Sequence, residues 1–153
     1  MAGYNENDKH ILKLVEEWAR CWNTPGLAER MVDEIYADST EVFTPLQKAY
    51  YVKKGKSKEN WKRVEMEAEK LYQKREMKIV KSVVSGNTIA LEAATTFTFI
   101  DGSTTSGWFA AFLEFDKDGK VISDHTYMPG PPPGKGVYPP GLKEAMDKIA
   151  AEQ

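Results

Sequence analysis

Three short turn sequences divide the second half of this chain into segments of strand length. They are Ser85-Gly86-Asn87, Asp101-Gly102 and Asp118-Gly119, and such combinations of Gly, Asn and Asp are typical of tight hairpin turns. The segments around them are rich in Val, Ile, Thr and Phe, which favour strands. We therefore expect consecutive antiparallel strands near residues 74–84, 87–100, 105–116 and 120–128.

The first half of the chain has the apolar periodicity of three amphipathic helices. The first helix carries an inward stripe that ends in two tryptophans, Trp18 and Trp22. The second helix, a short strand and the third helix are expected near residues 27–36, 41–44 and 57–71. Helices followed by hairpins predict an α+β fold, in which a cone-shaped, curved antiparallel sheet wraps around three N-terminal helices.

Length and composition predict a single domain. The 153 residues are 41% hydrophobic, which is enough for one core, and we expect this core over residues 8–128.

Charge and composition argue against several kinds of partner and site. A net charge of -2 without a basic stripe argues against binding to nucleic acid, and no apolar run is long enough for a membrane span. Without a signal-peptide pattern at the start we expect a cytoplasmic protein. One cysteine and two distant histidines argue against a disulfide and a metal site.

The last part of the chain, residues 129–153, reads as a tail. Residues 129–141 are rich in Pro and Gly, which exclude a helix or an inner strand, so we expect an irregular loop before a short helix near 142–151. The loop could simply tether that helix. Alternatively, it could act as a lid that places Val137 and Tyr138 over the mouth of a cavity.

Several short segments of the sequence resemble those of a known superfamily. They are Tyr36-Ala37-Asp38 running into a strand that Pro45 ends, Gly55 before the third helix, and the segment from Phe115 to Ile122 before an aromatic last strand. In this order they resemble the nuclear-transport-factor-two-like superfamily, SnoaL-like branch. The resemblance implies the cone fold and covers residues 8–128. It does not choose among cofactor-free isomerases, epoxide hydrolases, dehydratases, cyclases and non-catalytic binding domains.

The resemblance also indicates which mechanisms of the superfamily this chain lacks. The oxyanion tyrosine, the base and the second acid of ketosteroid isomerase would fall on Trp18, Thr44 and Ala111. The catalytic residues of limonene epoxide hydrolase would fall on Ala93, Thr95 and Thr126. The mechanisms of these two enzymes are therefore expected to be absent from this chain.

Period-two alternation predicts which residues of the last strand face the interior. It points Ile122, Asp124 and Thr126 inward, which makes Asp124 the one carboxylate expected on the cavity face. Apolar walls should raise its pKa toward the range of a general acid or base, although a solvated or lysine-paired Asp is the alternative. His125 faces the other side of a regular strand, but a β-bulge would turn it inward, so it competes as proton carrier. Tyr127 shares its parity and could donate to an oxyanion.

We therefore predict a cofactor-independent acid–base enzyme, of lyase, isomerase, dehydratase or cyclase type. Its substrate would be a small hydrophobic molecule, aromatic or polycyclic, and its catalytic residues Asp124, His125 and Tyr127. The sequence has no glycine-rich phosphate loop, so we expect no organic cofactor. The alternative is a non-catalytic domain for small-ligand binding or dimerisation. The expected substrate-binding residues are Trp18, Trp22, Tyr36, Thr44, Tyr50, Trp61, Thr95, Phe97, Phe109, Thr126 and Tyr138.

The central strands also predict a partner. Between Phe97 and Phe115 nearly every position is apolar or Thr, which indicates strands covered on both faces. One face would pack on the helices. The other needs a partner, and we expect a homodimer through the sheet.

Overall fold

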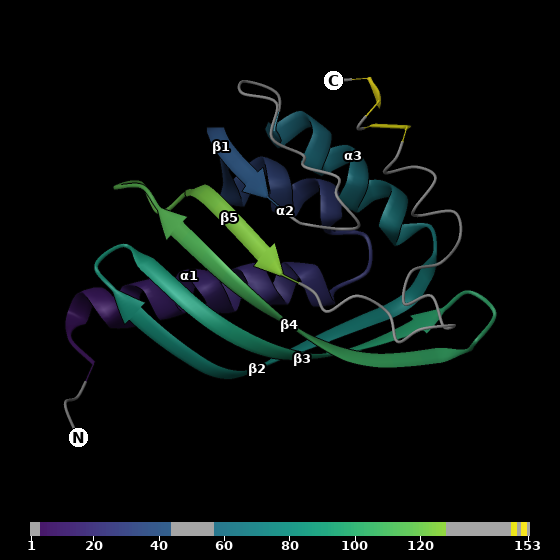
Figure 1. Cartoon of the computed structure of the whole chain (residues 1–153), viewed down its shortest axis with the longest axis horizontal. Coiled ribbons are helices and arrows are strands. Elements are labelled where there is room, and N and C mark those ends of the chain that lie inside the picture. The colour runs from purple at the N-terminus through teal and green to yellow at the C-terminus, as the bar shows by residue number, and fades with distance from the viewer. Residues whose placement is uncertain (1–3, 44–56, 128–147, 150, 153) are drawn as a thin grey trace.

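The computed structural model describes residues 4–43, 57–127, 148–149 and 151–152. Its helices and strands confirm the α+β class (Figure 1). In chain order, the elements are α1 (Glu6–Asn23), α2 (Ala28–Ile35), β1 (Tyr36–Phe43), α3 (Ser57–Glu69), β2 (Tyr72–Ser85), β3 (Thr88–Phe99), β4 (Thr104–Phe115) and β5 (Val121–Tyr127).

Helix α1 is fixed at both of its ends. At the start, the side chain of Asn5 accepts a hydrogen bond from the backbone N–H of Asp8, and the Asp8 carboxylate accepts one from the backbone N–H of Asn5. This reciprocal capping box satisfies two N–H groups that a helix start leaves free. At the other end, the Asn23 side chain bonds both the N–H and the C=O of Met77 in β2. These contacts hold the tryptophan-bearing end of α1 against the sheet.

The sheet is mixed, with the strand order β1-β5-β4-β3-β2. The three predicted hairpins are confirmed, and Gly102 in the β3–β4 turn has a φ of +83°, a conformation that glycine adopts without steric cost. Strand β1 runs parallel to β5, so the sheet is mixed, while the other neighbouring strands are antiparallel as the sequence predicts. Parallel neighbours need a long connection, and α3 and three strands lie between these two in the chain.

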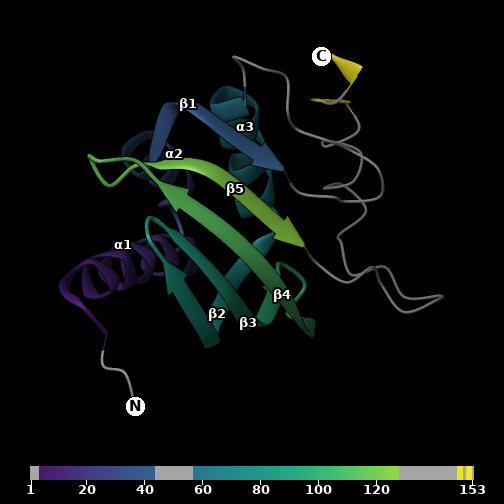
Figure 2. The same cartoon turned by 60° about the vertical axis from the view of Figure 1, so that its left-hand side comes forward.

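All three helices lie on the concave face of the sheet, which bends around them (Figures 1 and 2). Side chains of the central strands alternate between two faces, because one set is buried toward the helices while Glu92 and Trp108 are exposed on the convex outer face. The inward set is Leu91, Ala93, Thr95, Phe97, Phe109, Ala111, Leu113 and Phe115.

The second helix ends one residue earlier than the sequence pattern predicts. Helix α2 ends at Ile35, and Tyr36 is the first residue of β1, where it is buried. An apolar residue at helical spacing can equally begin a buried strand, so the periodicity could not separate the two. This change of element matters because Tyr36 now reaches the last strand.

The predicted tail is described only at residues 148–149 and 151–152. There, Ile149 packs against Val64 and Ala68 of α3. The predicted lid with Tyr138 lies outside the described residues, as do the predicted binding residues Thr44 and Tyr50. Within the described part of the chain, no helix combines the length and the apolar character that crossing a membrane requires.

Candidate active site

Asp124 and three other side chains form a hydrogen-bonded network in the interior. Asp124 is 1% exposed, and its Oδ2 accepts a hydrogen bond of 2.7 Å from the hydroxyl of Tyr36. Its Oδ1 accepts a bond of 2.7 Å from the hydroxyl of Thr126. The Tyr36 oxygen in turn accepts from Nε1 of Trp18 over 3.0 Å. The network therefore joins α1, β1 and β5 around one carboxyl group.

Strand pairing explains why Asp124 faces the interior. It lies opposite Leu113 of β4 and Val42 of β1, which are both buried. The predicted inward orientation of Asp124 agrees with this register. The prediction for Ile122 is wrong, because a register shift between β4 and β5 turns Val121 into the core in its place.

Burial is the main influence on the proton affinity of Asp124. Removal from water penalises the charged carboxylate and raises the pKa of Asp124 to about 6, while the hydrogen bonds from Tyr36 and Thr126 lower it. The negative charge of Glu65 acts in the same direction as burial. Burial also raises the pKa of Tyr36 well above its usual range, so this phenol stays a donor. A carboxyl group that gains and loses a proton near neutral pH suits acid–base chemistry.

Aromatic side chains from helices and strands pack beside this network. Trp18 meets Phe109 edge to face with ring centroids 6.4 Å apart, and Trp22 meets Phe97 at 5.7 Å. These four residues, which the sequence predicts to bind substrate, therefore lie together and are buried. Trp61 of α3 is only partly buried against the same core.

His125 and Tyr127 lie on the opposite face of β5 from Asp124. The ring of His125 is 5.1 Å from that of Phe43, and Tyr127 lies 6.2 Å from Phe112, all on the outer face. Tyr127 is 42% exposed. The structure thus does not bring these two predicted catalytic residues together with Asp124.

The interior also holds an ion pair that the sequence pattern did not single out. Arg75 of β2 lies 2.5 Å from Glu65 of α3, with both side chains under 10% exposed. Nε of Arg75 donates to the backbone oxygen of Trp22, and the guanidinium lies 4.4 Å from the centre of the Trp22 ring. The signal was present in the sequence, since Glu65 falls four residues after Trp61 and three before Ala68 on the inner face of α3.

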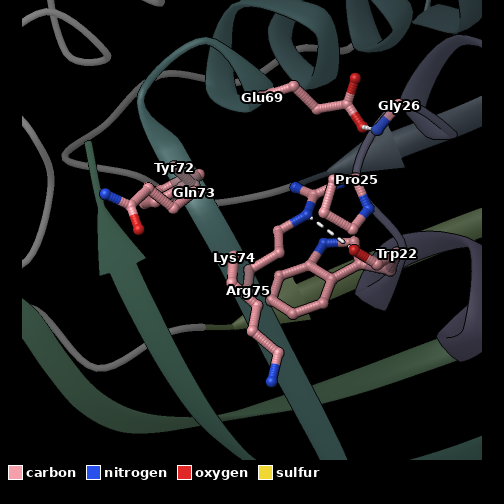
Figure 3. Close-up of a pocket in the computed structure, with 8 residues that line it drawn as sticks. All are labelled: Trp22, Pro25, Gly26, Glu69, Tyr72, Gln73, Lys74 and Arg75. Atoms are coloured by element: carbon pink, nitrogen blue, oxygen red, sulfur yellow. Dashed lines mark hydrogen bonds between the residues drawn. The ribbon is translucent and has the colours of Figure 1, made fainter. Parts of the chain in front are cut away.

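A pocket of about 120 Å³ opens beside this ion pair, at the edge strand β2 (Figure 3). Glu69 lies on the wall opposite Arg75, and its Oε1 accepts hydrogen bonds from the backbone N–H groups of Gly26 and Ala28. This space is small beside the roughly 300–1,000 Å³ of ligand pockets. The deep apolar cavity that the sequence predicts therefore stays a prediction. The pocket is lined by Trp22, Pro25, Gly26, Glu69, Tyr72, Gln73, Lys74 and Arg75.

Metal ligands do not gather anywhere in the part of the chain that the structure describes. There, no group of three or more His, Cys, Asp or Glu side chains is placed to hold an ion. Cys21, the single cysteine, is buried in the helix–sheet core.

The comparisons with known proteins rest on structure. No family model matches the sequence, and no curated protein is similar enough to count as a relative. Among solved structures, an NTF2-like protein from Anabaena variabilis has a TM-score of 0.65 at 15% identity, covering 86% of this chain and 96% of its own.

Two further solved structures carry names that suggest chemistry. A candidate SnoaL-like polyketide cyclase from Jannaschia sp. CCS1 has a TM-score of 0.61 at 13% identity, over 82% of this chain and 90% of its own. The epoxide hydrolase/cyclase-like enzyme SalBIII, which acts in pyran ring formation in salinomycin, has a TM-score of 0.63 at 14% identity, over 82% and 95%. At such identities the likeness concerns the fold. The chain therefore has the cone-shaped fold of the NTF2-like superfamily, which SnoaL-like and ketosteroid isomerase-like proteins share.

Proposed function

We propose that this protein is a cofactor-independent acid–base enzyme of the cyclase or isomerase kind, which acts on a small hydrophobic molecule inside the cone. The buried carboxyl group of Asp124 carries this proposal, because a group with a pKa of about 6 can both accept and return a proton near neutral pH. The fold shared with a candidate polyketide cyclase and with SalBIII supports the reaction class. The substrate itself is proposed only as a class.

Access to Asp124 leads through Thr126. Asp124 is 1% exposed, whereas Thr126 is only half-buried and already donates its hydroxyl proton to Asp124. In the proposed step, a substrate C–H or O–H gives its proton to the Thr126 oxygen while the Thr126 hydroxyl proton moves to Asp124. The reverse transfer returns a proton to the product. Trp18 and Tyr36 hold the carboxylate in place during both transfers.

Two unpartnered donors support a substrate that carries oxygen. Within the described residues, Nε1 of Trp61 and the hydroxyl of Thr95 are buried without a hydrogen-bond partner. A buried donor without a partner costs about 1–3 kcal/mol. A carbonyl or ether oxygen of a bound molecule would satisfy either of them. We therefore propose a hydrophobic substrate with at least one such oxygen.

Proton exchange at carbon tests the proposal without knowledge of the natural substrate. We expect the protein to exchange the hydrogens beside the carbonyl of beta-tetralone, an aromatic ketone, when both are placed in deuterium oxide and followed by mass spectrometry. Exchange should rise with pH through about 6 as Asp124 ionises. Asp124→Asn and Thr126→Val should reduce it to the buffer background, whereas Thr126→Ser keeps the hydroxyl and should retain it.

His125→Asn is the matched control for this experiment, since His125 lies on the outer face of β5. Its exchange rate should stay close to that of the unchanged protein, and the midpoint of its pH profile should rise only slightly, because the His125 charge is the last-ranked influence that lowers the pKa of Asp124. Equal rates in the protein and its Asp124→Asn variant would contradict a proton role of Asp124. The protein would then be interpreted as a non-catalytic binding domain of the same fold.

We also propose that the protein forms a homodimer through the sheet, by the part of its outer face around Trp108 and outside the groove that Phe112 and Tyr127 line. Trp108 supports this, because it is 56% exposed beside Ala94 on that face. A large exposed apolar ring on the outer face of a sheet is typical of an interface. Light scattering at micromolar concentration should give a dimer that Trp108→Glu converts to a monomer, while Ser85→Glu, at the far end of β2, leaves it intact. A monomeric starting protein would contradict the dimer.

A further inference from the structure

A groove of about 330 Å³ lies on the outer face of the sheet, away from Asp124. Its position follows from the strand register, in which His125 lies opposite Phe112 of β4 and beside Phe43 of β1. Phe112 and Trp108 are four residues apart on β4, which separates them by roughly 13 Å along the strand. The groove is lined by Thr88, Phe112, Leu113, Glu114, Ser123, His125 and Tyr127.

The apolar side of this groove is built from aromatic rings that hold one another. Tyr127 packs against Phe112 at right angles with centroids 6.2 Å apart, and against Phe43 at 5.8 Å. Phe43 also packs on His125 at 5.1 Å. Even so, Phe112 is 50% and Tyr127 is 42% exposed. Two ring surfaces are thus fixed in place and still open to a ligand.

The polar side of the groove is negative. Glu114 lines it, and Glu41 lies in the same cross-strand row, with Ser123 between the two carboxylates. No ion pair joins Glu41 or Glu114 to any residue that the structure describes, and the nearest polar partner of Glu114 is Nδ2 of Asn87 at 3.4 Å. No Lys or Arg side chain is among the lining residues. The groove therefore offers ring faces and unpaired negative charge together.

We propose that this outer-face groove binds a small organic cation of the alkylammonium or quaternary ammonium class. Ring faces attract such cations electrostatically, and a nearby carboxylate supplies the opposite charge. The volume lies at the small end of the range for ligand pockets, which suits a free small molecule. This site goes beyond the proposed enzyme and does not depend on it, because the groove and Asp124 lie on opposite faces of the sheet.

Tetramethylammonium is the probe that tests this site, with neopentyl alcohol as a neutral molecule of nearly the same shape. In NMR titrations of the full chain, tetramethylammonium should shift the signals of Phe112 and Tyr127, and it should bind at least about fivefold more tightly than neopentyl alcohol. Phe112→Leu and Glu114→Gln should each lower the affinity for tetramethylammonium by about fivefold. Glu92→Gln makes the same chemical change as Glu114→Gln on the same face but outside the groove, and it should leave tetramethylammonium binding unchanged.

Three outcomes would overturn the proposal. Equal affinity for the two probes would show an apolar groove without preference for charge. Shifts that follow protein concentration in place of added tetramethylammonium would show that a second copy of the chain covers the groove. Unchanged binding in both Phe112→Leu and Glu114→Gln, with each variant folded by circular dichroism, would place the cation elsewhere. None of these results depends on exchange activity at Asp124, so failure here and failure of the enzyme are distinguishable.

Discussion

The hydroxyl of Tyr36 donates a 2.7 Å hydrogen bond to Asp124, and this bond joins residues 88 positions apart through two parallel strands. Because the Tyr36 oxygen also accepts from Trp18, one phenol holds the carboxylate and the indole together. The bond stabilises the ionised form of Asp124, while burial favours the protonated form. The pKa of Asp124 therefore reflects burial, which raises it, against the hydrogen bonds from Tyr36 and Thr126, which lower it.

The variant Tyr36→Phe removes the hydroxyl that donates to Asp124 and accepts from Trp18. The variant leaves the Trp18 N–H without its acceptor and Asp124 with one donor fewer, so we expect a loss of about 1–3 kcal/mol in the free energy of unfolding. The pKa of Asp124 should rise further, because a hydrogen bond that lowers it is gone. Urea unfolding and an NMR titration measure the two effects. Thr126→Val is the control, since it removes the other donor to Asp124 but leaves Trp18 paired.

The stability of the protein should depend on pH through Asp124. Its pKa rises from the ordinary 3.8 to about 6 on folding, so between these values the folded protein binds a proton that the unfolded chain has lost. The resulting stabilisation is complete below pH 3.8 and is lost as the pH rises through about 6, a change on the order of 3 kcal/mol. Urea midpoints measured between pH 4 and pH 7 should therefore fall less steeply in Asp124→Asn. Identical slopes would show that Asp124 titrates alike in both states.

Loss of one member of the buried ion pair should be costly. Arg75→Met leaves the Glu65 carboxylate, whose side chain is 5% exposed, without its cation, and we expect a loss of about 3–5 kcal/mol in the free energy of unfolding. The double variant Arg75→Met with Glu65→Gln should recover much of it, because no unpaired charge remains. A double-mutant cycle by urea unfolding measures the coupling. Additive losses in the two single variants would contradict a direct pairing.

Alternation along the strands predicted the part of the site that lies within one element. It places Asp124 inward and His125 outward on β5, and the burial of Asp124 agrees with this. It could not predict the partner of Asp124, because Tyr36 continues the helical spacing of α2 and only the parallel pairing of β1 with β5 brings it close. Contacts between distant segments leave no periodic signal.

The ion pair was missed for a related reason. The third helix is rich in Lys and Glu, and such residues ordinarily lie on the solvent-exposed face of a helix. Composition therefore gives no indication that Glu65 lies on the buried face. The sequence also does not indicate the irregular register between β4 and β5. Regular alternation therefore predicts that Ile122 faces the core, whereas Val121 occupies that position. Strict periodicity fails wherever a bulge or a buried charge interrupts it.

A direct titration of Asp124 shows whether this carboxyl group can carry a proton near neutral pH. Carbonyl-detected NMR of carbon-13-labelled protein, with the Asp124→Asn variant to assign the signal, gives the midpoint of this one carboxyl group. We expect a midpoint of about pH 6, set by burial, and a higher one in Tyr36→Phe. A midpoint near the ordinary value of 3.8 would contradict it, because a carboxyl group that stays ionised through the neutral range could not return a proton to a product.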